Sequence, residues 1–140
     1  MGSLLTNNTL GIIGFGKIGK KLAQLTSGFE MEYLIYDPYL DKSVFNDKPN
    51  FTLTTLSDLF INSDVISIHV NLSKETKSMI NYNLISKMKS NSILINASRG
   101  EILVEDDLLR ALNEKIISGA ALDVFSKEPY DGKLLNYENI

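Results

Sequence analysis

Apolar residues along the chain gather into short runs, and longer segments with apolar residues three or four positions apart separate these runs. The runs consist mainly of Ile, Leu, Val and Ala and are bounded by Gly, Asn or Asp. This pattern is typical of strands that are buried on both faces of a sheet. The predicted strands are Thr9–Gly14, Glu32–Tyr36, Phe51–Leu53, Asp64–His69, Ser92–Asn96 and Ser118–Asp123.

The segments between the runs carry helical spacing. The first predicted helix covers Lys17–Gly28 and places Ile18, Leu22 and Leu25 on one face. The second predicted helix begins at Ser57. The third follows a cap at Asn81 and places Leu84, Ile85 and Met88 on one face. The fourth places Val104, Leu108 and Leu112 on one face.

This alternation of strands and helices predicts an α/β fold: a doubly wound parallel sheet in three layers, with right-handed crossovers. Ligands of such sheets bind outside the carboxyl ends of the strands. We expect one domain over residues 4–140, because no linker divides the chain. Met1-Gly2-Ser3 resembles an expression scar and is left out of the fold prediction.

A glycine pattern follows the first predicted strand and opens the first predicted helix. Gly14, Gly16 and Gly19 form G-x-G-x-x-G, and Asp37 ends the second strand. A helix over Lys17–Gly28 would rise ~18 Å, so the return strand brings Asp37 back beside Gly14. A pyrophosphate then approaches Gly16 and the helix N-terminus, while Asp37 accepts the adenosine ribose hydroxyls. The pattern therefore predicts a Rossmann site for NAD rather than NADP; the alternative is an ordinary glycine turn.

Composition narrows the classes of function. The chain has 140 residues, is 44% hydrophobic and carries a formal net charge of −3. Its Lys and Arg residues are interspersed with acids, which gives no basic face for nucleic acid. No apolar stretch approaches membrane-spanning length. The absence of cysteine excludes disulfides and fits a reducing, cytoplasmic location, and no metal site is predicted.

Further polar residues follow the later strands at the same predicted edge. Arg99 leaves the fifth strand, where its forked donors would suit a carboxylate; the alternative is a surface ion pair with Glu101 or Glu128. Asp123 either accepts hydrogen bonds from a carboxamide or caps its strand. His69, the only histidine, is expected to contact a dinucleotide rather than act as a base, because no carboxylate is near it in sequence.

Five ordered motifs resemble one known family. They are Gly11–Gly19, Asp37–Pro38, His69–Thr76, Asn96–Gly100, and Gly119–Phe125 followed by Glu128–Pro129. These segments cover nearly the whole chain and resemble the NAD-binding domain of the D-isomer-specific 2-hydroxyacid dehydrogenases.

The resemblance implies roles for the polar edge. Arg99 would bind the substrate carboxylate and polarise the carbonyl group, and Glu128 would support the catalytic histidine, so both are predicted catalytic residues. Together with the positions argued above, it predicts these cofactor-binding residues: Gly14, Gly16, Lys17, Ile18, Gly19, Asp37, His69, Val70, Asn71, Ala97, Ser98 and Asp123.

The resemblance also implies parts that this sequence lacks. The family places a substrate domain before the first strand and the catalytic histidine a few residues beyond Ile140. Asn71 stands where the family has proline. We therefore expect a fragment that binds NAD at best and shows no turnover, with the alternative that the fragment alone does not bind NAD measurably. Its parent would take a small 2-hydroxy or 2-keto acid and could form a homodimer. The alternative is an NAD-sensing or corepressor-like binding module.

Overall fold

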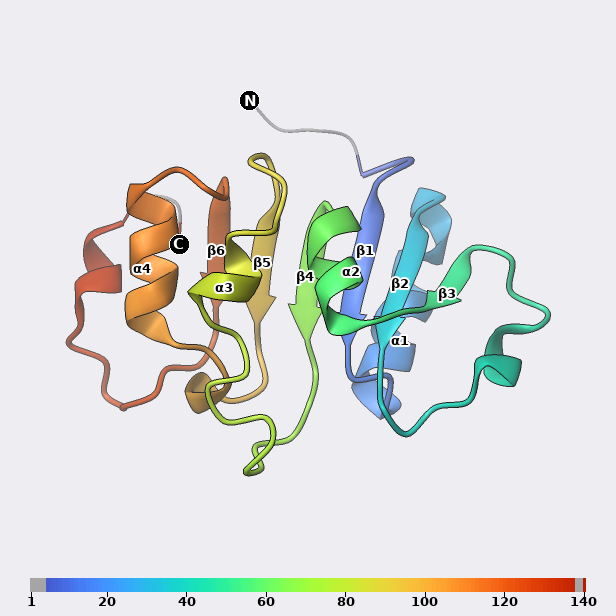
Figure 1. The fold of residues 1–140 in the computed structure, drawn as a ribbon, viewed down its shortest axis with the longest axis horizontal. Coiled ribbons are helices and arrows are strands. Elements are labelled where there is room, and N and C mark those ends of the chain that lie inside the picture. Colours follow the sequence, from blue (N-terminus) through green and yellow to red (C-terminus); the bar gives the residue numbers. More distant parts are fainter. Residues whose placement is uncertain (1–4, 138–139) are drawn as a thin grey trace.

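The computed structural model of the chain describes residues 5–137 and 140 and is built around a parallel sheet of six strands (Figure 1). The strands are β1 (Thr9–Ile13), β2 (Glu32–Tyr36), β3 (Phe51–Leu53), β4 (Val65–Ile68), β5 (Ile93–Asn96) and β6 (Gly119–Leu122). Their order across the sheet is β3-β2-β1-β4-β5-β6, and every neighbouring pair is parallel. The predicted doubly wound α/β fold is confirmed.

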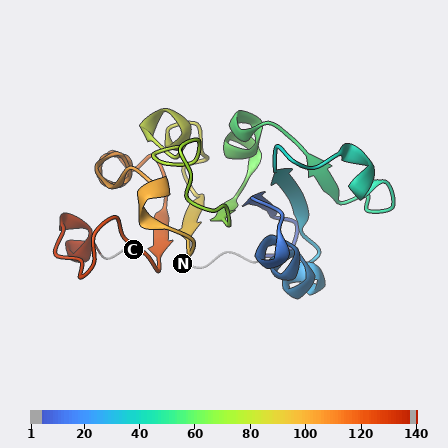
Figure 2. The ribbon, with the colours of Figure 1, turned by 90° about the horizontal axis from the view of Figure 1, so that it is seen from below.

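The helices lie on both faces of the sheet. They are α1 (Lys17–Thr26), α2 (Leu56–Asn62), α3 (Tyr82–Ile85) and α4 (Glu105–Asn113). Single 3₁₀ turns cover Ser27–Phe29, Lys42–Phe45, Gly100–Ile102 and Lys133–Asn136. Seen along the strands, α1 covers one face and α2, α3 and α4 cover the other (Figure 2). The strand order reverses direction at β1, so right-handed crossovers on its two sides reach opposite faces.

Side chains on the two faces of the sheet form two buried clusters. Ile13, Ile66 and Leu94 belong to the cluster beneath α2, α3 and α4, where all three are fully buried. The α1 face buries Ile12 together with an aromatic group. In that group the rings of Phe15 and Phe45 meet edge to face and those of Tyr33 and Phe51 stack. Both faces are apolar along most of the sheet, as the continuous apolar runs predict.

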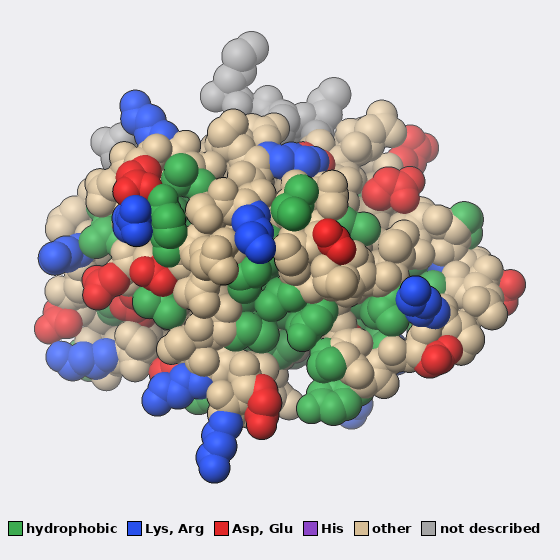
Figure 3. Space-filling view, in the orientation of Figure 1, with side chains coloured by type: hydrophobic (Ala, Val, Ile, Leu, Met, Phe, Trp, Pro, Cys, Tyr) green, Lys and Arg blue, Asp and Glu red, His purple; other side chains and the backbone are tan. Residues whose placement is uncertain are grey.

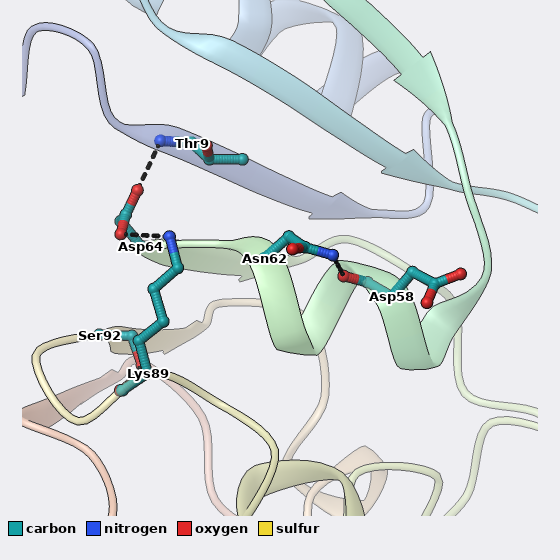
Figure 4. A network of polar contacts seen from close by, with 6 residues as sticks. All are labelled: Thr9, Asp58, Asn62, Asp64, Lys89 and Ser92. Carbon is teal, nitrogen blue, oxygen red and sulfur yellow. Dashed lines mark hydrogen bonds and ion pairs between the residues drawn. The ribbon is translucent and has the colours of Figure 1, made fainter.

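Asp64 ties the strands together at the amino edge of the sheet (Figure 4). One carboxylate oxygen accepts the backbone N–H of Thr9 at 2.9 Å, and the other pairs with the Lys89 ammonium at 2.7 Å. Ser92 donates to the Lys89 carbonyl at 2.6 Å. The Asp64 carboxylate therefore links the start of β1 to the segment that precedes β5 at the amino edge of the sheet.

Several predicted boundaries differ from the structure by one or two residues. Asp64 and His69 lie just outside β4, although their backbone N–H groups still bond to the β1 carbonyls of Thr9 and Ile13. The third helix is a single turn that Asn81 caps as predicted, and the buried Met88 lies beyond it. The predicted domain start at residue 4 and the Met1–Ser3 segment lie outside the described residues.

Of the apolar face predicted for α1, only Leu22 packs against the core. Ile18 and Leu25 are 67% and 68% exposed, and the buried residues of the helix are Gly19 and Ala23. A Cβ atom at Gly19 would overlap the Gly14 carbonyl oxygen. The helix therefore lies so close to the β1 turn that only small residues fit between them, and Ile18 and Leu25 point outward while Leu22 packs against the core cluster.

Candidate functional site

Five of the predicted cofactor residues line one cavity of about 370 Å³ at the carboxyl edge: Gly16, Asp37, His69, Val70 and Asn71. Seven further lining residues were not predicted: Tyr36, Pro38, Tyr39, Ser73, Glu75, Thr76 and Met79. Pro38 and Tyr39 could have been predicted as site residues, because they directly follow Asp37 at the end of β2. Apolar side chains gather below α2 and α3 toward this edge, and charged ones lie mostly around them (Figure 3).

Gly14 makes the turn out of β1 in a conformation that favours glycine, with φ at +89°. Its N–H donates to the Tyr36 carbonyl at 2.8 Å. A Cβ atom there would lie 2.8 Å from the His69 carbonyl oxygen. Gly14 therefore lets the ends of β1, β2 and β4 converge on the cavity.

Gly16 faces open space at the start of α1. A Cβ atom there would meet nothing within 4 Å, and the residue is exposed. It is the N-cap of α1, where no side chain bonds to the free N–H groups of the first turn. Lys17 and Ile18 begin the helix as exposed residues. This cradle of unpaired N–H groups and open backbone fits a phosphate of a dinucleotide.

Asp37 is held between two backbone N–H groups. Its Oδ2 accepts the N–H of Phe15 at 2.9 Å, and its Oδ1 accepts the N–H of Tyr39 at 3.0 Å. These bonds join the acid to the glycine turn, as the sequence spacing predicts. Each carboxylate oxygen keeps a further lone pair, so both remain able to accept a ribose hydroxyl.

His69 is half-buried at the end of β4, and its Nε2 lies 2.8 Å from the Ser67 hydroxyl. Burial lowers the pKa of His69 below the ordinary value of about 6.5. Its hydrogen-bond partner is a hydroxyl rather than a carboxylate, so among the described residues no acid orients it as a base.

We expect the stability of the chain to fall as the pH falls through about 6.5. The unfolded imidazole takes up a proton there while the folded one resists, so the contribution is complete above that pH and is lost below it. The dependence should be well under ~1.4 kcal/mol per pH unit, because the ring is half-exposed. Urea unfolding from pH 5 to 8 checks this, with His69→Gln as the reference; equal pH dependence in the two proteins would contradict it.

The loop after β4 is closed by its own side chains. The Thr76 hydroxyl donates to the Asn71 carbonyl at 2.6 Å, and the Ser73 N–H donates to Thr76 Oγ1 at 2.8 Å. Ser73 also donates to the Glu75 carboxylate at 2.7 Å. These bonds hold Asn71 at the cavity although it is not a proline.

Buried Asn96 shapes the turn that carries Arg99. Its Oδ1 accepts both the N–H and the hydroxyl of Ser98 at 3.1 Å, and its Nδ2 donates to the Arg99 carbonyl at 3.0 Å. Ala97 and Arg99 are exposed. Asn96 was not among the predicted site residues, although an asparagine that ends a buried strand is a recognisable turn signal.

The guanidinium of Arg99 donates to the Ser98 carbonyl at 2.6 Å. In the described part of the chain it forms no ion pair with Glu101 or Glu128. The structure therefore does not support the surface-pair alternative, and Arg99 lies outside the lining of the cavity.

Asp123 and Glu128 follow β6 and are exposed. The N–H of Asp123 donates to the Asn96 carbonyl at 3.0 Å, which continues the ladder between β5 and β6. Gly100 packs directly on the backbone of Phe125, where a Cβ atom would overlap it. The segments of Arg99 and Glu128 are thus joined at the same edge, outside the Asp37 cavity.

Comparison with known proteins identifies the family. Residues 1–140 match the family described as D-isomer specific 2-hydroxyacid dehydrogenase, NAD binding domain. The chain belongs to this family. The Bacillus subtilis D-3-phosphoglycerate dehydrogenase is 40% identical over 138 residues, which cover 98% of this chain and 26% of that protein.

Solved structures of 2-hydroxyacid dehydrogenases share the fold. A putative D-3-phosphoglycerate dehydrogenase from Ralstonia solanacearum superposes with a TM-score of 0.91 and 35% identity, over 99% of this chain and 41% of that one. The D-lactate dehydrogenase with NAD+ from Lactobacillus jensenii superposes with a TM-score of 0.84 and 33% identity, over 95% of this chain and 40% of that one. This dehydrogenase domain spans less than half the length of these relatives. Among residues 5–137 and 140, no helix is long and apolar enough to cross a membrane.

Proposed function

We propose that the chain binds NAD as the cofactor domain of an enzyme that transfers a hydride between NAD and a 2-hydroxy acid. The observation that carries the proposal is the carboxylate of Asp37, bonded to the glycine turn and lining the same cavity as Gly16. A negative charge at the ribose position favours NAD, because the 2′-phosphate of NADP would be repelled.

The two sides of the carboxyl edge would bind different parts of NAD. Gly16 and the first turn of α1 receive the pyrophosphate, Asp37 accepts the ribose hydroxyls, and Val70 borders the adenosine. Ala97, Ser98 and Asp123 line the nicotinamide side. The family membership supports these assignments, and the strand order is consistent with them, because β2, β1 and β4 form one side of the edge and β5 and β6 form the other.

Arg99 and Glu128 are proposed as the catalytic residues of this chain. The Arg99 guanidinium would pair with the substrate carboxylate and draw charge toward the carbonyl oxygen. Glu128 would orient a histidine that holds the hydroxyl proton. NAD, when bound, supplies the position that accepts or returns the hydride. The only histidine of the chain is His69, bonded to Ser67, so we expect no turnover by these 140 residues alone.

Three properties of the parent protein are proposed with this function. Its substrate is a small 2-hydroxy or 2-keto acid, it forms a homodimer, and it works in the cytoplasm. The family membership supports the substrate class. The absence of cysteine accommodates a reducing compartment.

Calorimetric titration of the 140-residue chain with NAD and with NADP tests the cofactor assignment. We expect NAD to bind more tightly; tighter binding of NADP would overturn the role of Asp37. A parallel assay with glyoxylate, pyruvate, hydroxypyruvate and phosphohydroxypyruvate should show no turnover. Robust turnover would overturn the claim that a histidine outside these residues is required.

Gly16→Ala should separate cofactor binding from folding. The added methyl meets no protein atom within 4 Å, so we expect an unchanged thermal unfolding midpoint. It would stand where the pyrophosphate approaches, and overlap of about 1–3 kcal/mol weakens NAD binding by about 5- to 150-fold. Gly28→Ala is the matched control, because its Cβ also meets open space but lies at the far end of α1. NAD affinity equal in both variants would contradict the phosphate position.

A further inference from the structure

Ser67 and His69 form a polar pair on and just beyond β4. The Ser67 side chain is 4% exposed, and its hydroxyl oxygen lies 2.8 Å from His69 Nε2. Ser67 makes no other side-chain hydrogen bond within the described residues. Which of the two groups donates therefore decides whether the buried hydroxyl hydrogen has a partner.

The two possible arrangements have unequal costs. When Nε2–H donates to Ser67, the hydroxyl hydrogen points into the core without an acceptor, which costs about 1–3 kcal/mol. When the hydroxyl donates to Nε2, both groups are satisfied and the single ring proton resides on Nδ1. The second arrangement is favoured, and the hydroxyl then acts as the donor.

Nδ1 of His69 has no hydrogen-bond partner in the described part of the chain. Ser63 Oγ is the one fully buried side-chain nitrogen or oxygen without a partner there, so Nδ1 reaches solvent. His69 lines the same cavity as Gly16 and Asp37. His69 thus has a solvent-accessible Nδ1 on a ring that lines the edge where the dinucleotide is proposed to bind.

We propose that Ser67 is a positioning residue that fixes His69 in the Nδ1–H tautomer, so that a neutral ring donates to an oxygen of the bound dinucleotide. Burial favours the neutral ring, because it lowers the pKa of His69. A neutral donor suits a ribose or phosphate oxygen and leaves Asp37 and Glu75 as the charged groups that line the cavity. The inference rests on the proposed function for its ligand but not for its tautomer.

The tautomer is measurable in the wild-type chain without ligand. His69 is the only histidine, so a long-range proton–nitrogen correlation spectrum at pH 8 contains one imidazole. We expect Nδ1 to carry the proton and Nε2 to resonate as an unprotonated nitrogen. A protonated Nε2 would overturn the inference.

Ser67→Ala tests the positioning role, with Ser63→Ala as the matched control. Both variants remove a buried serine hydroxyl, but that of Ser63 has no partner in the described residues. Ser67→Ala should raise the Nε2–H population and weaken NAD binding by about two- to tenfold, the range for one hydrogen bond. Ser63→Ala should leave both unchanged. Equal NAD affinity in Ser67→Ala and the wild type would overturn the role.

Different results would overturn the proposed function and the inference about the tautomer of His69. A wild-type chain that binds no NAD would overturn the proposed function and the donor role together. An Nε2–H tautomer in a chain that does bind NAD would overturn the inference alone.

Discussion

Asp37→Ala is expected to weaken NAD binding by between about 10- and 150-fold, which corresponds to a loss of about 1.5–3 kcal/mol for hydrogen bonds to a charged group. The variant should also lose most of its discrimination against NADP. The carboxylate that accepts the ribose hydroxyls is the same group that repels a 2′-phosphate. Calorimetric titration of both cofactors gives the two affinities and their ratio.

The ratio separates the charge of Asp37 from its structural role. Asp37 also satisfies the N–H of Phe15, a residue that is 3% exposed, so the variant should be less stable by about 1–3 kcal/mol. A loss of stability alone weakens NAD and NADP equally. An unchanged ratio in a folded Asp37→Ala protein would therefore contradict the ribose assignment.

Asp41→Ala is the control for this experiment. Asp41 Oδ1 accepts the N–H of Ser43 at 2.9 Å, a backbone bond of the same kind, and Asp41 does not line the cavity. We expect a small loss of stability and no change in the ratio of the two affinities.

The place of Asp37 was predictable because it depends only on lengths. A helix of known rise and a strand of known rise return the chain to the edge it left, and Gly14 donates to the Tyr36 carbonyl there. The same reasoning placed His69 and Arg99 at this edge, after the fourth and fifth predicted strands, whereas the order of the strands came only from the structure. Regular elements allow such arithmetic because each residue advances the chain by a fixed distance.

The face of α1 was not predictable from its own pattern. Ile18, Leu22 and Leu25 show ideal helical spacing, yet Gly19 and Ala23 face the sheet. The sequence signal was present in the third glycine of the fingerprint, which allows close packing of helix and strand. Tertiary contact overrode the amphipathic pattern, because the distance between helix and sheet decides which side chains fit.

Loop geometry accounts for the site residues that the sequence analysis did not predict. Thr76 and Met79 reach the cavity only because Thr76 and Ser73 close the loop after β4. Asn96 bonds to its own turn through contacts that depend on the backbone path. The place of Thr76 and Met79 at the cavity follows no period, so sequence spacing gave no means to predict it, and only the strand end at Asn96 was predictable.

Gly100→Ala is expected to lower the free energy of unfolding by at least about 3 kcal/mol, the upper range for an overpacked core. The new methyl would overlap the backbone carbonyl group of Phe125 and the backbone nitrogen of Ser126. Backbone atoms have no rotamer by which to move aside, so the two segments must separate. Urea unfolding measures the loss, and Gly28→Ala, with open space around its Cβ, should show none.

Separation of the two segments would free the loop that carries Glu128. Lys127 precedes Glu128, so tryptic cleavage there should be faster in Gly100→Ala under conditions where the wild type and Gly28→Ala resist. The Asp37 cavity is built from the ends of β1, β2 and β4, and Gly100 lies beyond β5. Folded Gly100→Ala should therefore retain the preference for NAD over NADP, which Asp37 sets, while it loses the junction between Arg99 and Glu128. A variant that lost this preference and kept the loop protected would show that the two sides of the edge are not independent.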